Sequence, residues 1–274
     1  MTMGAMSRWM PLATGLDDDR NTRLHLALAL FLLASLVVFA PAMFLDTRVL
    51  DSAPVWIKPQ KFNLSLAMHF FTLALLFQLV PRNVRTGPAL TTFTYLAAGA
   101  LLLEFVYITL QAGRERRSHF NYDTPFEATM YMAMGAGAVL LVAVAFVLAI
   151  QIWRHGDRTR SGLWLGAILG LSLGFGTTLL FGSYLSAHGR YVGAPLTGGG
   201  AVVPLLGWSR EYGDLRPAHF FALHLMQTVP LAGWLADRRA WNGKLVVVSV
   251  AALQVILATF LFLQARAGHP IWPL

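Results

Sequence analysis

The chain has 274 residues, of which 56% are hydrophobic and 12% are charged, and its formal net charge is +8. Soluble domains carry about 25% charged residues, so this composition excludes a soluble enzyme and a disordered chain. It also excludes a β-barrel porin, whose strands would alternate apolar and polar residues instead of forming continuous apolar runs. Because the chain has no cysteine, disulfides, thiolate metal sites and cysteine nucleophiles are excluded as well.

Seven apolar runs follow one another along the chain, each close to the 20 or so residues that a helix needs to cross a bilayer. In chain order they cover residues 24–45, 61–81, 89–112, 126–152, 162–185, 218–236 and 245–266. Lipid cannot satisfy the polar groups of an open backbone, so such runs must be helical. The sequence therefore predicts an all-α integral membrane protein in which residues 1–274 form a single domain, a seven-transmembrane-helix bundle.

Three of these runs carry features that affect processing or packing. The first run is longer than the 7–15 apolar residues of a signal peptide, so we expect it to be a retained anchor. The fifth repeats Gly166, Gly170 and Gly174 at every fourth residue, which lets another helix or a flat ligand approach closely. The sixth contains Pro230, which should disturb the helical hydrogen bonds near Met226.

The basic residues indicate an orientation and a lipid environment. The short connections 82–88, 153–161 and 237–244 are basic and otherwise featureless, which is typical of cytoplasmic turns. We therefore expect the N-terminus to be cytoplasmic and the C-terminus to be outside, in a bacterial inner membrane. Because the basic residues lie between apolar runs, anionic lipid explains the positive charge, and we expect a lipid bilayer rather than nucleic acid as the partner.

Three ionisable side chains inside the apolar runs are predicted to lie at a similar depth. At a rise of about 1.5 Å per residue, His69 and Glu104 lie about 12 Å below the outer ends of their runs, and His224 lies about 9 Å below. Ionisable groups are costly in the apolar core, so each is a candidate functional residue that needs a partner. The sequence thus predicts one water-accessible site in the outer leaflet.

Neighbouring polar residues extend this predicted site. Ser65 shares a helical face with His69, and Gln227 shares one with His224. The outer connections add further basic, amide and acidic side chains. The candidate substrate-binding residues are Lys58, Lys61, Tyr107, Gln111, Arg114, Arg117, Asn121, Asp214, Arg216 and Gln227.

The leading functional hypothesis is a metal-dependent enzyme embedded in the membrane. His69, Glu104, His219 and His224 are the candidate ligands of a divalent metal, Zn²⁺ or Fe²⁺, with one position left open for water or substrate. A bound metal would lower the pKa of that water, and Glu104, Ser65 and His119 are the candidate catalytic residues. The basic rim would attract a lipid or another amphiphilic anionic small molecule.

One part of this pattern resembles a known family. Ser65-x-x-x-His69 on the second run, followed by later histidines, is similar to part of the pattern of the alkaline ceramidase and adiponectin receptor superfamily. The resemblance implies a seven-helix zinc hydrolase. It covers a handful of positions, and the late pair differs, because that family has His-x-x-x-His where this chain has His219 and His224.

Two other functions fit the same residues. His69 and His224 could be opposite axial ligands of haem b in a protein of electron or quinol transfer, with Lys61, Arg114 or Arg117 binding the propionates. Alternatively, Glu104 and the histidines could titrate during alternating access in a proton-coupled transporter, where the Pro230 bend would mark a discontinuous helix.

Overall fold

The computed structural model describes residues 19–51, 53–194 and 200–272, and the chain is mostly helical, at 74%. The helices are α2 (Arg20–Leu45), α3 (Ile57–Phe77), α4 (Arg82–Arg85), α5 (Pro88–Gly113), α6 (Pro125–His155), α7 (Ser161–His188), α8 (Arg216–Leu223), α9 (Leu225–Arg239) and α10 (Gly243–Arg266). The short strands β1 (Val49–Leu50) and β2 (Ala53–Pro54) pair with each other, as do β3 (Tyr191–Val192) and β4 (Gly213–Asp214), and both pairs are antiparallel.

Five of the helices in the described part of the chain are long and apolar enough to cross a membrane, namely α2, α5, α6, α7 and α10. The protein is therefore an all-α integral membrane protein. The predicted second and sixth spans correspond to α3 and to α8 with α9, which are not among these five. The sixth is not one continuous helix, because α8 ends at Leu223 and α9 begins at Leu225. The count of seven spans stays a prediction.

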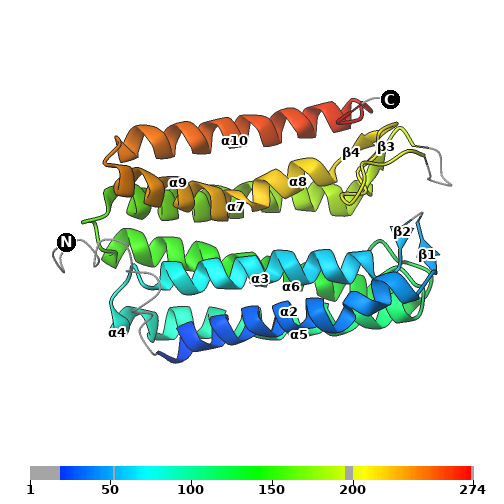
Figure 1. Cartoon of the computed structure of the whole chain (residues 1–274), viewed down its shortest axis with the longest axis horizontal. Helices are drawn as coiled ribbons and strands as arrows, with labels where there is room; N and C mark the ends of the chain where they lie inside the picture. The colour runs from blue at the N-terminus through cyan, green and yellow to red at the C-terminus, as the bar shows by residue number, and fades with distance from the viewer. Residues whose placement is uncertain (1–18, 52, 195–199, 273–274) are drawn as a thin grey trace.

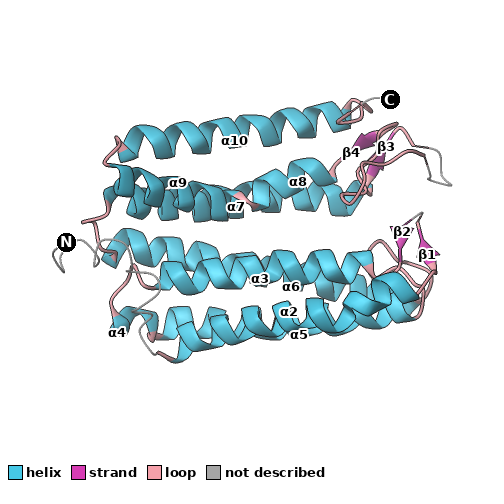
Figure 2. Cartoon of the chain, in the orientation of Figure 1, coloured by secondary structure: helices cyan, strands magenta, loops and turns pink. Residues whose placement is uncertain are grey.

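The long helices lie side by side in two layers, α2, α3, α5 and α6 in one and α7 to α10 in the other (Figure 1). All four strands lie at one end of the bundle, and α4 lies at the opposite end (Figure 2). We call these the strand end and the α4 end. The fully buried core side chains come largely from the first layer and include Phe70, Phe77, Leu101 and Leu148.

The small residues of α7 hold α9 at very short range. A Cβ atom added to Gly166 would lie 2.7 Å from the carbonyl oxygen of Val229, and one added to Gly170 would lie 2.7 Å from that of Leu225. Such distances leave no space for a side chain, so the two backbones are in contact. Of the two interpretations of the glycine repeat, the structure supports helix packing.

The interruption between α8 and α9 falls at His224, two residues before the position expected from Pro230. Pro230 lies inside α9, and its ring would contact a Cβ added to Gly170. Thr228 donates both its backbone N–H and its hydroxyl to the His224 carbonyl oxygen. The break between α8 and α9 is thus held by hydrogen bonds in the middle of the bundle.

Candidate functional site

The carboxyl group of Glu104 is deeply buried in the bundle. It lies on α5, and only 1% of the surface of the residue is exposed. Its Oε2 atom has no hydrogen-bond partner in the described residues. The Nε2 atom of His119 lies 3.9 Å from this oxygen. A buried polar atom without a partner is costly, so this oxygen is poised to accept or hold a proton.

Lys58 supplies a positive group beside this pair. It lies in the first turn of α3, ahead of the apolar part of that helix. Burial and the charge of Arg190 lower the pKa of Lys58 to about 7, although Glu104 and Asp51 raise it. We call Lys58, Glu104 and His119 the acid–base cluster, because each of the three side chains can gain or lose a proton.

His119 reaches Glu104 because the connection between α5 and α6 folds back into the bundle. The side-chain amides of Gln111 and Asn121 both donate to the Arg117 carbonyl oxygen, at 3.1 and 2.8 Å. The His119 ring then packs between Phe62 and Tyr131, with ring centroids 5.5 and 5.9 Å away. Burial, helped by the charges of Lys58 and Arg190, keeps the pKa of His119 well below 6.5, so the imidazole is neutral at pH 7.

The same connection is anchored by a buried carboxylate that was not among the predicted site residues. Glu127 accepts from Arg116 Nη2 at 2.6 Å and from Gln111 Nε2 at 3.1 Å. It also belongs to a capping box, in which its backbone N–H donates to the Thr124 hydroxyl at the start of α6. The Thr-x-x-Glu spacing is visible in the sequence, so this anchor could have been predicted.

Asp51 ties three connections together over the acid–base cluster. It lies at the β1–β2 turn and accepts from Arg117 of the α5–α6 connection, with a shortest contact of 2.6 Å. It also pairs with Arg190, which follows α7. Burial raises the pKa of Asp51, but the hydrogen bonds from the two arginines outweigh it and the pKa is lowered. No sequence motif marks Asp51 or Arg190.

Asp214 and Arg216 order the long connection between α7 and α8. Arg216 donates to Asp214 at 2.6 Å and to the Gly207 carbonyl oxygen at 2.6 Å. Lys61 on α3 donates to the neighbouring Leu206 carbonyl oxygen at 2.9 Å. These contacts hold Lys61, Asp214 and Arg216 at the strand end.

The predicted metal ligands do not converge. His69 Nε2 donates to the Leu141 carbonyl oxygen at 2.9 Å, and His224 Nδ1 donates to Gln227 Oε1 at 3.1 Å. The buried Nδ1 atom of His219 has no hydrogen-bond partner among the residues that the structure describes, and its ring packs against Gly182. Among the described residues, no group of three or more His, Asp or Glu side chains could hold a metal ion. Zinc, iron and haem therefore stay predictions without support from the geometry.

Of the remaining predicted site residues, three form a group beside Glu127, and one lies apart from the acid–base cluster. Gln111 Nε2 lies 3.1 Å from the Tyr107 hydroxyl, and Arg114 donates to Gln111 Oε1 at 3.1 Å, so these three form a group beside Glu127. Ser65 is half-buried on α3, one turn before His69. No described contact joins Ser65 to Glu104 or His119.

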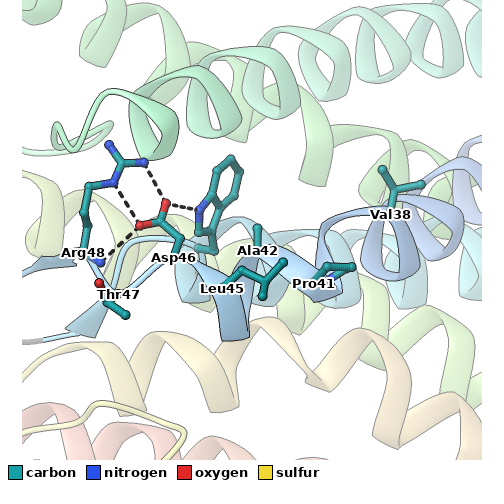
Figure 3. Close-up of a pocket in the computed structure, with 8 residues that line it drawn as sticks. Val38, Pro41, Ala42, Leu45, Asp46, Thr47 and Arg48 are labelled. Atoms are coloured by element: carbon teal, nitrogen blue, oxygen red, sulfur yellow. Dashed lines mark hydrogen bonds and ion pairs between the residues drawn. The ribbon is translucent and has the colours of Figure 1, made fainter.

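An open groove lies at the strand end of α2, outside the acid–base cluster. Its volume is about 590 Å³, and it is lined by Val38, Pro41, Ala42, Leu45, Asp46, Thr47, Arg48 and Trp56 (Figure 3). One wall is apolar, and the other carries the Asp46 carboxylate, which accepts from Arg48 and from the Trp56 indole. Arg48 in this lining immediately precedes β1, which leads to Asp51.

Comparison of the chain with protein-family models, with curated proteins and with solved structures gives no match.

Proposed function

We propose that the protein is a membrane-embedded enzyme that acts on a lipid or another amphiphilic anionic substrate at the strand end. The observation that carries this proposal is the buried pair of Glu104 Oε2 and His119 Nε2, 3.9 Å apart, with Lys58 beside it. Buried acids and bases of perturbed pKa gather at catalytic sites more than elsewhere. A gap of this size closes to a hydrogen bond in many enzymes when substrate binds.

The chemistry follows from the three groups. Neutral His119 accepts a proton from a hydroxyl or water of the substrate complex, and Glu104 stabilises the imidazolium that results. Lys58 is partly protonated near pH 7, so it both attracts an anionic headgroup and returns a proton to a leaving group. Lys61 and Arg216 add positive charge at the same end of the bundle.

The proposal includes the finer membrane topology. We infer that α3 and the α8–α9 pair also cross the bilayer, which gives seven spans, with the strand end outside a bacterial inner membrane. Helix α3 has 21 residues, and α8, His224 and α9 together have 24, so each is long enough to cross a bilayer core. Two further hypotheses are a metal at His69, Glu104, His219 and His224, and haem b. Elemental analysis of the purified protein tests the first, and its visible spectrum tests the second.

The test is an untargeted turnover assay. Purified protein in vesicles of bacterial polar lipids should change the abundance of at least one lipid species, measured by mass spectrometry, and Glu104→Gln should abolish the change. His119→Gln should lower the rate by about 10²–10⁴-fold, the range expected for loss of a general base. Glu115→Gln and His155→Gln, at exposed positions, are the matched controls. Equal turnover by Glu104→Gln and Glu115→Gln would refute the assignment.

The interruption at His224 favours a second candidate function, proton-coupled transport. Transporters place discontinuous helices near the middle of the membrane and bind substrate there, and α8 and α9 meet at a buried histidine. The vesicle assay separates the two functions. A transporter would move a solute across the membrane without changing it chemically, and a proton gradient would drive that movement.

A further inference from the structure

We propose that Arg117 and Arg190 form a binding site for a phosphate group, and that Asp51 occupies this site in the structure as an internal substitute for the phosphate. This inference deepens the proposed function, on which it rests for the role of the site, by naming the chemical class of the headgroup. The site is built from three connections at the strand end, each reaching it from a different pair of helices.

The contacts of Asp51 are those of a bound anion. Arg117 donates from Nε to both carboxylate oxygens, at 3.0 and 3.1 Å, and from Nη2 at 2.6 Å. Arg190 donates to the second oxygen. Two guanidinium groups on one anion are the arrangement by which proteins recognise phosphate, because each planar fork matches a pair of its oxygens.

The charge of the site exceeds what Asp51 neutralises. Two arginines carry a formal charge of +2, and both pair with the single carboxylate of Asp51. One carboxylate therefore balances only one of the two positive charges. A phosphate monoester with about two negative charges near neutral pH would balance both arginines.

The site can be reached, and Asp51 can leave it. The side chains of Asp51, Arg190 and Arg117 are 24%, 25% and 51% exposed, so the ion pairs face solvent. Asp51 lies at the turn of a two-residue hairpin, with a φ angle of 51°, and partly exposed ion pairs of this kind contribute little to stability. A phosphate group can therefore compete with this carboxylate.

The groove beside α2 indicates an amphiphilic source for the phosphate. Its apolar wall of Val38, Pro41 and Leu45 (Figure 3) leads to Asp46 and Arg48, which precede β1 in the same connection. An acyl chain along α2 would thus end near the hairpin that carries Asp51. A phospholipid with a terminal phosphate has both an acyl chain for the groove and a phosphate for the two arginines, whereas a soluble phosphate ester has only the phosphate.

The experiment measures phosphate binding by the full-length protein in detergent, with inorganic phosphate as one probe and a short-chain phosphatidic acid as the other. Asp51→Asn should raise the affinity for both probes about tenfold, because the internal competitor loses its charge. Arg117→Gln and Arg190→Gln should each lower it at least tenfold. Asp157→Asn is the control, since that exposed carboxylate lies at the α4 end and accepts from Thr159 instead.

The outcomes distinguish the possible ligands and separate this inference from the proposed function. Competition between the two probes would identify a phospholipid site, and binding of inorganic phosphate alone would identify a soluble phosphate ester. Equal affinities of the wild type, Asp51→Asn, Arg117→Gln and Arg190→Gln would overturn the inference, provided that their unfolding midpoints agree. Glu104→Gln should bind phosphate as the wild type does, so loss of turnover in that variant with intact binding tests only the acid–base cluster.

Discussion

Lys58 is unusual because its surroundings favour the neutral amine more than water does. Burial and the positive charge of Arg190 oppose protonation, and Glu104 and Asp51 favour it, so that the pKa falls to about 7. The side chain therefore changes its charge in the range where cells operate. His119, only a few ångströms from Glu104, is held neutral by the same burial and by the same basic neighbours.

The first prediction concerns this lysine. Because the lowered pKa leaves the ammonium form below about pH 7 and the free amine above it, labelling of Lys58 by an amine-reactive reagent should rise about tenfold between pH 6 and pH 8 and then level off. Glu104→Gln should move the midpoint to lower pH, since Glu104 favours the charged form. Glu115→Gln is the control. Peptide mass spectrometry gives the rate, and labelling that keeps rising steeply above pH 9 would contradict the assigned pKa.

The α7–α9 seam determines how the second layer is built. Gly162, Gly166 and Gly170 on α7 would each place a Cβ atom within 2.7 Å of an atom on α9. Without a side chain between them, the two backbones pack by van der Waals contact, which is the main attractive term between helices in lipid. The seam also fixes the angle at which α8 continues from His224 toward the strand end.

The second prediction tests this seam. Gly166→Ala should lower the unfolding free energy by about 1–3 kcal/mol, the usual cost of overpacking, because the methyl group would collide with the Val229 carbonyl oxygen. Gly176→Ala on the same helix has open space around it and should leave the unfolding midpoint unchanged or slightly higher. Thermal unfolding in detergent measures both variants. Equal unfolding midpoints for the two variants would mean that α7 and α9 accommodate the added methyl group without loss of stability.

At the scale of the whole molecule, the polar chemistry is divided between the two ends. The strand end holds the acid–base cluster, the three-way ion pair of Asp51 and the connection ordered by Asp214 and Arg216. The α4 end holds a separate buried network, in which Asn21 donates to the Arg85 carbonyl oxygen at 2.7 Å and Arg85 lies 3.6 Å from Asp19. The two sides of the membrane therefore meet different surfaces of this protein.

The third prediction is the topology. Because the natural chain has no cysteine, single variants can be labelled without background. Thr47→Cys at the strand end should react with an impermeant maleimide from outside the cell. Thr86→Cys and Thr159→Cys at the α4 end should react only after the membrane is made permeable. Labelling of Thr47→Cys and Thr86→Cys from the same side would show that α3 does not cross the bilayer.

The sequence predicts the helices well, because apolar runs of this length have few other structures in lipid. It also singles out Glu104, Lys58 and His119, because ionisable groups next to apolar runs are rare. The predicted depth of each residue in the membrane could not show which of these side chains contact one another. His69 was placed at the level of Glu104, but its ring turns toward the Leu141 carbonyl oxygen on α6, and the direction of a side chain around its helix depends on packing.

The position of His119 could not be predicted for a different reason. It lies in a connection whose course depends on hydrogen bonds from Gln111 and Asn121 and on left-handed backbone angles at Glu115 and Phe120. Neither residue is a glycine, so no local sequence pattern marks these turns. The interruption at His224 escaped prediction as well, because the proline that suggested a bend lies inside α9.

The double use of Glu127 limits how the protein can be engineered. The same carboxylate accepts from the Thr124 hydroxyl at the start of α6 and from Arg116 of the connection that carries His119. An epitope tag or a fluorescent insert between residues 114 and 124 would therefore unsettle a helix start and the candidate site together. The turn at Thr159, whose hydroxyl and amide bond to Asp157 two residues away, offers a safer place for such an insertion.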